Sequence, residues 1–307
     1  MIHKEFKVKG TGGSEYRVIT EHFSSLSECV RTVEKRSIFS TANEDCAYLQ
    51  KQSLGGHRST WCGFESPEDM KDICLNGLHE SPDVDKVIKY SSKALAEKVD
   101  KLVSPVLDVA GGGVDVPEFL SGSPECMRGL KRKHVRSRVV KVAVDTEVMC
   151  DISVGQYIKA GMAIAGAVAS LEKAGYRVRL TALAPFYNDN RDAAIMSAVV
   201  KRENEPCNFR RLLMPMMSTA FFRGIGFNWV VCLDTYHAGF GLGTRITSMF
   251  DRSTRDAQVR ELYAKATGSD VRNIFRIDDI IGMIQRSGED ATEKFLRANM
   301  LDLEVEA

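Results

Sequence analysis

The sequence lacks the features that would direct it to a membrane, an export pathway or a common zinc site. No apolar run approaches the roughly 20 residues that cross a bilayer, and the opening MIHKEFKVKGTGG has no apolar core of a signal peptide. The eight cysteines include no CxxC pair, so no zinc site is indicated. The net charge of +1 gives no overall attraction to nucleic acid. We therefore expect a cytoplasmic protein with no membrane partner, whose nucleic-acid binding would depend on a local patch.

Glycine loops for binding phosphate are also missing. Residues 139–180 predict a strand, a helix and a second strand, the unit that opens many nucleotide-binding domains. The loop after the first strand, DTEVMCDISVGQ, contains only Gly155, whereas a dinucleotide-binding loop needs three spaced glycines. No Walker A sequence occurs anywhere in the chain. The unit is therefore predicted to be scaffold, and no nucleotide cofactor is expected.

The order of the expected elements is typical of an α/β protein with a mostly parallel sheet flanked by helices, a Rossmann-like topology. Residues 138–144 predict a first strand, 156–174 a helix and 176–183 a parallel second strand. The segment AAIMSAVVK at 193–201 predicts an antiparallel edge strand. The later elements are a helix at 209–223, a buried strand NWVVCLDTY at 228–236, a helix at 255–266, a strand RNIFRID at 272–278 and closing helices to 299.

Four regions are expected along the chain. Residues 1–103 predict a smaller mixed α/β region that begins with the hairpin EFKVKG-TGGS-EYRVIT and contains a helix from Pro67, ended by Gly77. Residues 104–130 are rich in turn-forming residues and predict a connection. Residues 131–299 predict the main α/β domain, and residues 300–307 an acidic tail.

This order of elements resembles the von Willebrand factor type A fold. In that family a D-x-S-x-S loop after the first strand and a later aspartate hold a divalent ion. Asp145 directly follows the first strand here and Asp234 lies in VVCLDTYHAG, but neither DTEVM nor DISVG keeps both serines. The resemblance implies a protein-interaction module whose magnesium site, at Asp145 and Asp234, is degenerate or absent. A metal-dependent hydrolase that uses the same two aspartates is a further alternative.

A second resemblance concerns three segments: WCGFESPEDMKDICLNGL, DVAGGGVDVPEFLSGSPECM and GMAIAGAVASLEKAGYRV. Together they look like a phage-encoded family of unassigned function. The chain is also similar to the single-stranded DNA-binding transcription cofactor of podoviruses that carry their own small RNA polymerase. That similarity implies binding of unwound promoter DNA and recruitment of the phage RNA polymerase in the host cytoplasm.

One basic run could supply the cations for this function, because a single strand needs cations along its backbone and aromatic faces for its bases. The run contains Lys131, Arg132, Lys133, Arg136, Arg138 and Lys141 with no acid among them, and Arg210, Arg211, Arg223 and Trp61 complete the predicted set. Phe209, Phe221, Phe222 and Trp229 are further aromatic candidates. A solvated linker and ordinary core aromatics would explain the same residues. No catalytic motif occurs, so we do not expect an enzyme.

Overall fold

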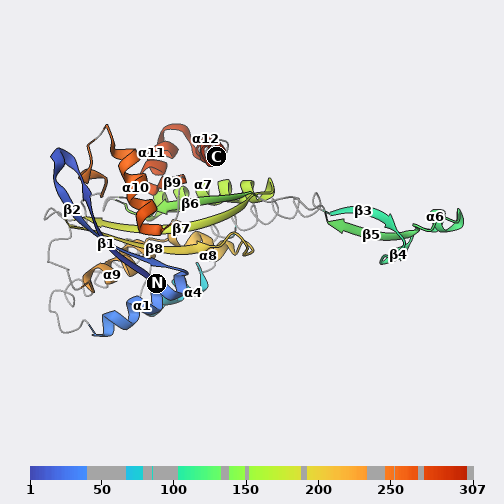
Figure 1. Ribbon diagram of the computed structural model, residues 1–307, viewed down its shortest axis with the longest axis horizontal. Coiled ribbons are helices and arrows are strands. Elements are labelled where there is room, and N and C mark those ends of the chain that lie inside the picture. Colours follow the sequence, from blue (N-terminus) through green and yellow to red (C-terminus); the bar gives the residue numbers. More distant parts are fainter. Residues whose placement is uncertain are drawn as a thin grey trace.

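The computed structural model describes residues 1–39, 67–78, 85, 103–132, 138–148, 152–187, 192–233, 246–251, 253–268 and 273–302. Within these ranges the strands form two separate sheets (Figure 1). The larger, six-stranded sheet has the order β1-β2-β8-β7-β6-β9, and the smaller has the order β3-β5-β4. We call the part built around the larger sheet the body and the smaller sheet with its helix the arm.

The sheet of the body is mostly parallel, as expected for an α/β protein. Its strands are β1 (Ile2–Lys9), β2 (Glu15–Phe23), β6 (Val139–Asp145), β7 (Arg177–Tyr187), β8 (Asp192–Lys201) and β9 (Asn273–Arg276). The pairs β2-β8, β6-β7 and β6-β9 are parallel, whereas β1-β2 and β7-β8 are antiparallel. The expected β1-β2 hairpin and the antiparallel direction of β8 are therefore confirmed.

Most helices cover one face of this sheet (Figure 1). Cores on that face join alternate residues of β6, β7 and β8 to α1 (Leu26–Phe39), α4 (Pro67–Asn76), α7 (Val154–Lys173), α8 (Phe209–Met217), α9 (Phe227–Val231), α11 (Ile277–Ser287) and α12 (Glu289–Asp302). A π-helix, η3 (Ala220–Gly226), lies among them. The opposite face packs against α10 (Arg255–Thr267) and the short η4 (Ile246–Met249). We call this second face the α10 face.

The N-terminal hairpin belongs to the body, which corrects the expected boundary between residues 1–103 and 131–299. β2 pairs with β8 from Arg17↔Asp192 to Phe23↔Ala198, so β8 is an interior strand and not the expected edge. Glu21 is 2% exposed and accepts hydrogen bonds from Arg36 of α1 and from Trp229 Nε1 of α9 at 2.7 Å each. Burial would raise the pKa of Glu21, but these donors hold it below its ordinary value. β2 is thereby tied to helices from both halves of the chain.

Two further expectations are wrong. The apolar run at 228–236 does not form a strand in its described part, because residues Phe227–Val231 form α9. An apolar run this short does not distinguish a buried strand from a buried helix. Residues 104–130 are not only a connection, since they form most of the arm: β3 (Val103–Asp108), β4 (Gly113–Val114), α6 (Val116–Leu120) and β5 (Met127–Arg132). In Figure 1 the arm stands apart from the body.

Two remaining expectations concern the end of the chain and membranes. Residues up to Asp302 belong to α12, and the rest of the acidic tail, 303–307, lies outside the described residues. None of the helices that the structure describes combines the length and apolarity that a membrane span requires.

Helices α7 and α8 pack closely at a glycine. A Cβ added to Gly161 of α7 would overlap the backbone carbonyl of Met216 in α8, whereas one added to Gly155, near the start of α7, would meet nothing within 4 Å. Tyr157 of α7 donates a hydrogen bond to the backbone oxygen of Pro215 at 2.8 Å. The two backbones can therefore approach this closely only because glycine, which has no side chain, occupies position 161.

We predict that Gly161→Ala lowers the free energy of unfolding by about 1–3 kcal/mol, because the added methyl forces the two helices apart. Gly155→Ala is the matched control. It should leave stability unchanged or raise it by up to about 1 kcal/mol, since alanine favours helix more than glycine does. Urea denaturation followed by circular dichroism measures both, and equal midpoints for the two variants would contradict the prediction.

Candidate nucleic-acid interface

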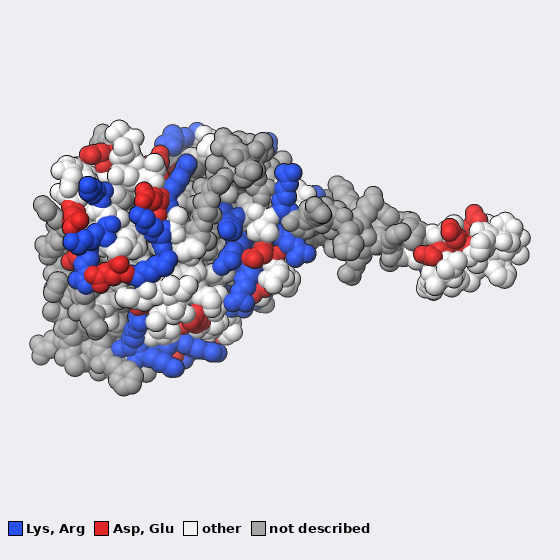
Figure 2. Space-filling model, in the orientation of Figure 1, with Lys and Arg blue, Asp and Glu red and all other residues white. Residues whose placement is uncertain are grey.

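Four cations gather where β6 and β7 begin. Arg138 immediately precedes β6, Lys141 lies within it, and Arg177 and Arg179 lie at the start of β7. Val140, Val142, Val178 and Leu180 point into the core under α7, so the alternating residues Lys141, Arg177 and Arg179 point to the α10 face. We call these four cations the basic strand end. Figure 2 shows Lys and Arg side chains, with a few acidic ones among them, at the end of the body nearest the arm.

Like charges oppose one another across this surface. Lys141 is the register partner of Arg179, and the backbone N–H of Arg177 donates to the carbonyl of Arg138 at 2.9 Å. Arg179 has one acidic neighbour, Glu203, at 3.9 Å. No acidic side chain among the described residues pairs with Arg138, Lys141 or Arg177. Like charges directly opposite each other on neighbouring strands are unfavourable, so the basic strand end is a surface that an anion would stabilise.

The pKa of His22 is lowered by burial and, to a smaller extent, by nearby positive charges. His22 lies on β2, on the α10 face, and its Nδ1 is 2.9 Å from Ser197 Oγ of β8. Burial is the largest cause that lowers the pKa of His22, followed by the positive charges of Arg179, the N-terminal ammonium and Lys4. The charges of β1 and β7 therefore act together on one face of the sheet.

The other predicted cations do not join this group. Arg210 and Arg211 begin α8, on the opposite face of the sheet, and Arg211 Nη2 contacts Ser27 Oγ at 3.4 Å. Arg223 is 1% exposed inside η3, so it cannot contact a DNA strand on the surface. The aromatic candidates Phe209, Phe221, Phe222 and Trp229 are all buried core residues. Arg223 and these aromatic residues belong to α8, η3 and α9, which pack in the core, and this explains why their side chains are buried.

Several predicted residues are only partly described. Lys131 and Arg132 end β5 of the arm, which brings the start of the basic run to the base of the arm and its end to the body. Lys133, Arg136 and Trp61 lie outside the described residues. Sequence reasoning missed Arg177 and Arg179. Their spacing in the sequence could have identified them, because two cations separated by one apolar residue in a predicted strand lie on the same face.

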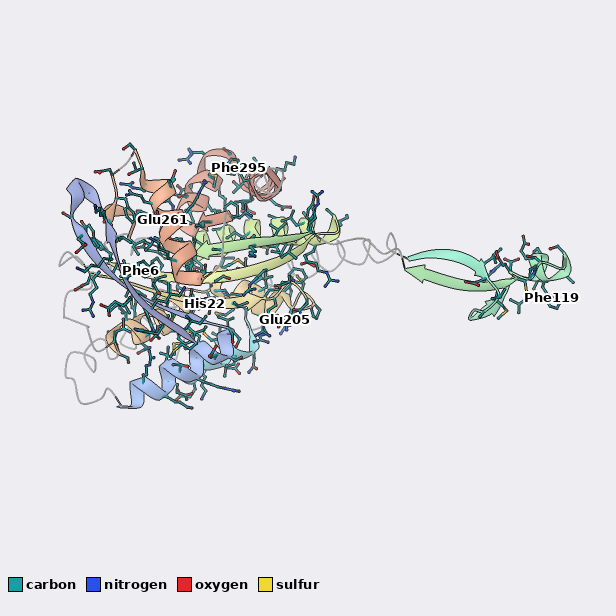
Figure 3. The ribbon with its side chains drawn as sticks, viewed as in Figure 1. Phe6, His22, Phe119, Glu205, Glu261 and Phe295 are labelled. Carbon is teal, nitrogen blue, oxygen red and sulfur yellow. The ribbon has the colours of Figure 1, made fainter. Side chains whose placement is uncertain are left out.

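The tip of the arm has the opposite chemistry. Residues 104–127 include Asp108, Asp115, Glu118 and Glu125 but no lysine or arginine. Val116, Phe119 and Leu120 of α6 are 59%, 61% and 77% exposed. Figure 2 shows the tip as white and red, and Figure 3 labels Phe119 on it. An exposed apolar group of this kind is chemically suited to a protein contact rather than to a phosphate contact.

Asp145, one of the two expected metal ligands, is occupied within the fold. It is 1% exposed at the end of β6, where it accepts a hydrogen bond from Tyr263 Oη of α10 at 2.6 Å and from the backbone N–H of Glu147 at 2.9 Å. Burial raises the pKa of Asp145 to about 6, against the opposing effect of these two donors. Its first role is therefore to anchor α10 to the sheet.

The rest of the expected magnesium site finds no support in the described residues. Asp234 lies outside them, and they contain no group of three or more histidine, cysteine or acidic side chains placed to hold a metal. Asp279, which follows β9, pairs with Arg276 at 2.6 Å. The described aspartates at strand ends, Asp145 and Asp279, thus make hydrogen bonds and ion pairs within the fold.

Comparison with known proteins gives a family without a function. The model of a family described as a domain of unknown function (DUF7192) matches residues 5–281, and the chain belongs to this family. The matched range runs from β1 into α11 and includes the whole arm. No curated protein and no solved structure matches the chain. Any statement about function therefore rests on the geometry of the surfaces described above.

The buried carboxyl at Asp145 predicts a pH dependence of stability. Its pKa in the folded protein lies above the ordinary 3.8, so the folded state holds the proton more tightly than the unfolded state does. The stability that Asp145 contributes is therefore present below about pH 4 and is lost as the pH rises through 6. Relative to Asp145→Asn, the wild-type protein should lose about 2 kcal/mol of unfolding free energy between pH 4 and pH 7.

Urea denaturation of both proteins across this pH range measures the difference. Tyr263→Phe provides a second check, because removal of the hydroxyl that lowers the pKa of Asp145 should enlarge the pH-dependent loss. A stability difference between wild type and Asp145→Asn that does not change with pH would show that the carboxyl keeps an ordinary pKa.

Proposed function

We propose that this protein binds single-stranded DNA through the basic strand end and acts as a phage transcription cofactor that recruits an RNA polymerase in the host cytoplasm. The observation that carries the proposal is the juxtaposition of Lys141 and Arg179 on neighbouring strands, with Arg177 on the same face and Arg138 just before β6. A phosphate backbone laid across β6 and β7 would relieve the repulsion between these cations.

The position of the cations favours a single strand over a duplex. They lie on the surface of a sheet, which is where the known sheet-based modules bind single strands. Reading a duplex usually requires a helix or a two-stranded ribbon that enters the major groove. The arm is a ribbon of this general kind, but its tip is acidic and would be repelled by DNA.

The arm supports the recruiting half of the proposal. Its tip carries exposed apolar side chains on α6, and its N-cap Asp115 is held by Arg128 at 2.8 Å, which fixes the start of that helix. An apolar, acidic tip fits a protein surface with an apolar pocket and basic rim. The body would thus hold the DNA while the arm contacts the polymerase.

A second candidate is a protein-interaction module related to von Willebrand factor type A domains. The exposed apolar side chains of the arm favour it, and it requires no DNA binding. The metal-dependent hydrolase draws no support from the described residues, because Asp145 is enclosed and bonded to Tyr263. Binding of DNA separates the first two candidates directly.

Removing two cations should weaken binding in a salt-dependent manner. We predict that Lys141→Ala combined with Arg179→Ala lowers affinity for a fluorescein-labelled single-stranded oligonucleotide. The slope of log K against log salt should fall by about 1 to 2, because each lost phosphate contact removes about 0.7. Lys35→Ala, an exposed cation of α1, is the matched control and should change neither quantity. Equal slopes for the double variant and wild type would rule out the basic strand end.

The arm should act independently of DNA binding. We predict that Phe119→Ser combined with Leu120→Ser leaves oligonucleotide affinity unchanged, because both side chains are exposed on the tip. The same variant should lose the stimulation of a phage RNA polymerase on single-stranded templates, measured as run-off transcript. Full stimulation by this variant would exclude the arm as the polymerase contact.

A further inference from the structure

A cavity of about 470 Å³ opens at the outer edge of β9. Its walls come from β9, α10, α11 and α12, and they include Arg260, Asn273, Phe275, Arg286 and Phe295. Among the described strands β9 pairs only with β6, so this cavity lies at the end of the described sheet. The volume is within the ordinary range of small-ligand pockets.

Asn273 gives the cavity an unused hydrogen-bond acceptor. The residue is 5% exposed, and its Nδ2 donates to the backbone oxygen of Lys141 at 3.1 Å. Its Oδ1 is buried and has no hydrogen-bond partner in the structure as described. A buried polar atom without a partner is unfavourable, so a ligand that donates an N–H group here would be stabilised.

An aromatic face and two cations complete the walls. Phe295 of α12 is 50% exposed, and Figure 3 shows it on the outside of the body. Arg260 and Arg286 are exposed and have no ion-pair partner among the described residues. Arg276 differs from them, because Asp279 at 2.6 Å and Asp256 at 3.8 Å already balance its charge. Asp278 and Asp279 also line the cavity, and Asp279 is the partner of Arg276. The cavity therefore combines an acceptor, a stacking surface, two arginines without an ion-pair partner among the described residues and two carboxyl groups.

In the order of the sheet the cavity lies one strand away from Lys141. Asn273 is the register partner of Val142, next to Lys141 in β6, and its amide holds the carbonyl of Lys141. Asn273 shares the face of Val142, whereas Lys141 and Arg179 lie on the α10 face, so a strand that crosses these cations must pass over the β9 edge, where Arg260 of α10 lies, to reach the cavity.

We propose that the cavity at the β9 edge binds one nucleotide of a single-stranded nucleic acid. The nucleobase donates an N–H group to Asn273 Oδ1 and stacks on Phe295, while Arg260 and Arg286 face its phosphate. Every nucleobase that pairs carries such a donor and a flat face, so the site accepts a base without selecting a sequence. This inference rests on the proposed function, since it places one base of the bound strand.

An extended peptide along the open edge of β9 is the competing occupant. The orphaned acceptor and the two unpaired arginines favour a nucleotide, because a peptide supplies no phosphate. If a peptide is the occupant, Phe295→Ala should not change the binding of nucleotides.

The test measures oligonucleotide affinity by fluorescence anisotropy with variants of exposed residues. Phe295→Ala should weaken binding about ten-fold with an unchanged salt slope, because stacking involves no counterion release. Phe295→Tyr should restore affinity. Arg286→Ala should weaken binding and lower the salt slope by about 0.7. Phe119→Ala, which removes an equally exposed ring from the arm, is the matched control and should have no effect.

A second measurement separates failure of the cavity from failure of the proposed function. Isothermal titration calorimetry with deoxyadenosine and thymidine monophosphate should show weak binding that Phe295→Ala abolishes. If wild type binds oligonucleotides but Phe295→Ala and Arg286→Ala bind equally well, the nucleotide site is overturned and the basic strand end stands. If monophosphates bind and oligonucleotides do not, the cavity is supported and the single-strand function fails.

Discussion

The parallel pairing of β2 with β8 is the interaction on which the rest of the body depends. It places the N-terminal hairpin against a strand 175 residues away in the sequence and encloses one core with α1, α4 and α9. Glu21 reinforces this junction through its bonds to Arg36 and Trp229. Because β2 occupies the outer side of β8, the sheet ends at β1 and β9. The cavity and the basic strand end lie toward the second of these ends.

The two faces of the sheet carry different side chains because successive residues of a strand point to opposite faces. In β6 the valines at 140, 142 and 144 pack under α7, which leaves Lys141 and Asp145 on the α10 face. Asp145 is then covered by Tyr263 of α10, whereas Lys141 lies beyond that helix and meets Arg179. One strand therefore anchors a helix at its end and presents a cation near its start.

Local patterns predicted a considerable part of the fold. The hairpin of β1 and β2, the helices from Pro67 and from Gln156, and the antiparallel β8 all follow from turn glycines, caps and apolar periodicity. The failures share a cause. Residues 227–231 are apolar except for Asn228 and too short to show a period, so helix and strand are not distinguished, and the arm at 103–132 has glycine and proline turns that resemble a linker.

The residues of the candidate site were likewise only partly predictable from local patterns. The sequence alone determined that Lys141 and Arg138 are exposed cations beside a strand, because a basic run cannot enter a core without partners. Only the tertiary structure decided that Arg177 and Arg179 lie beside them, that Arg223 is enclosed, and that Asn273 borders a cavity. Periodicity depends on near neighbours in the chain, whereas strand order depends on which distant strands bury the most apolar surface together. A sequence fixes the first directly, and the second emerges only when the whole sheet is assembled.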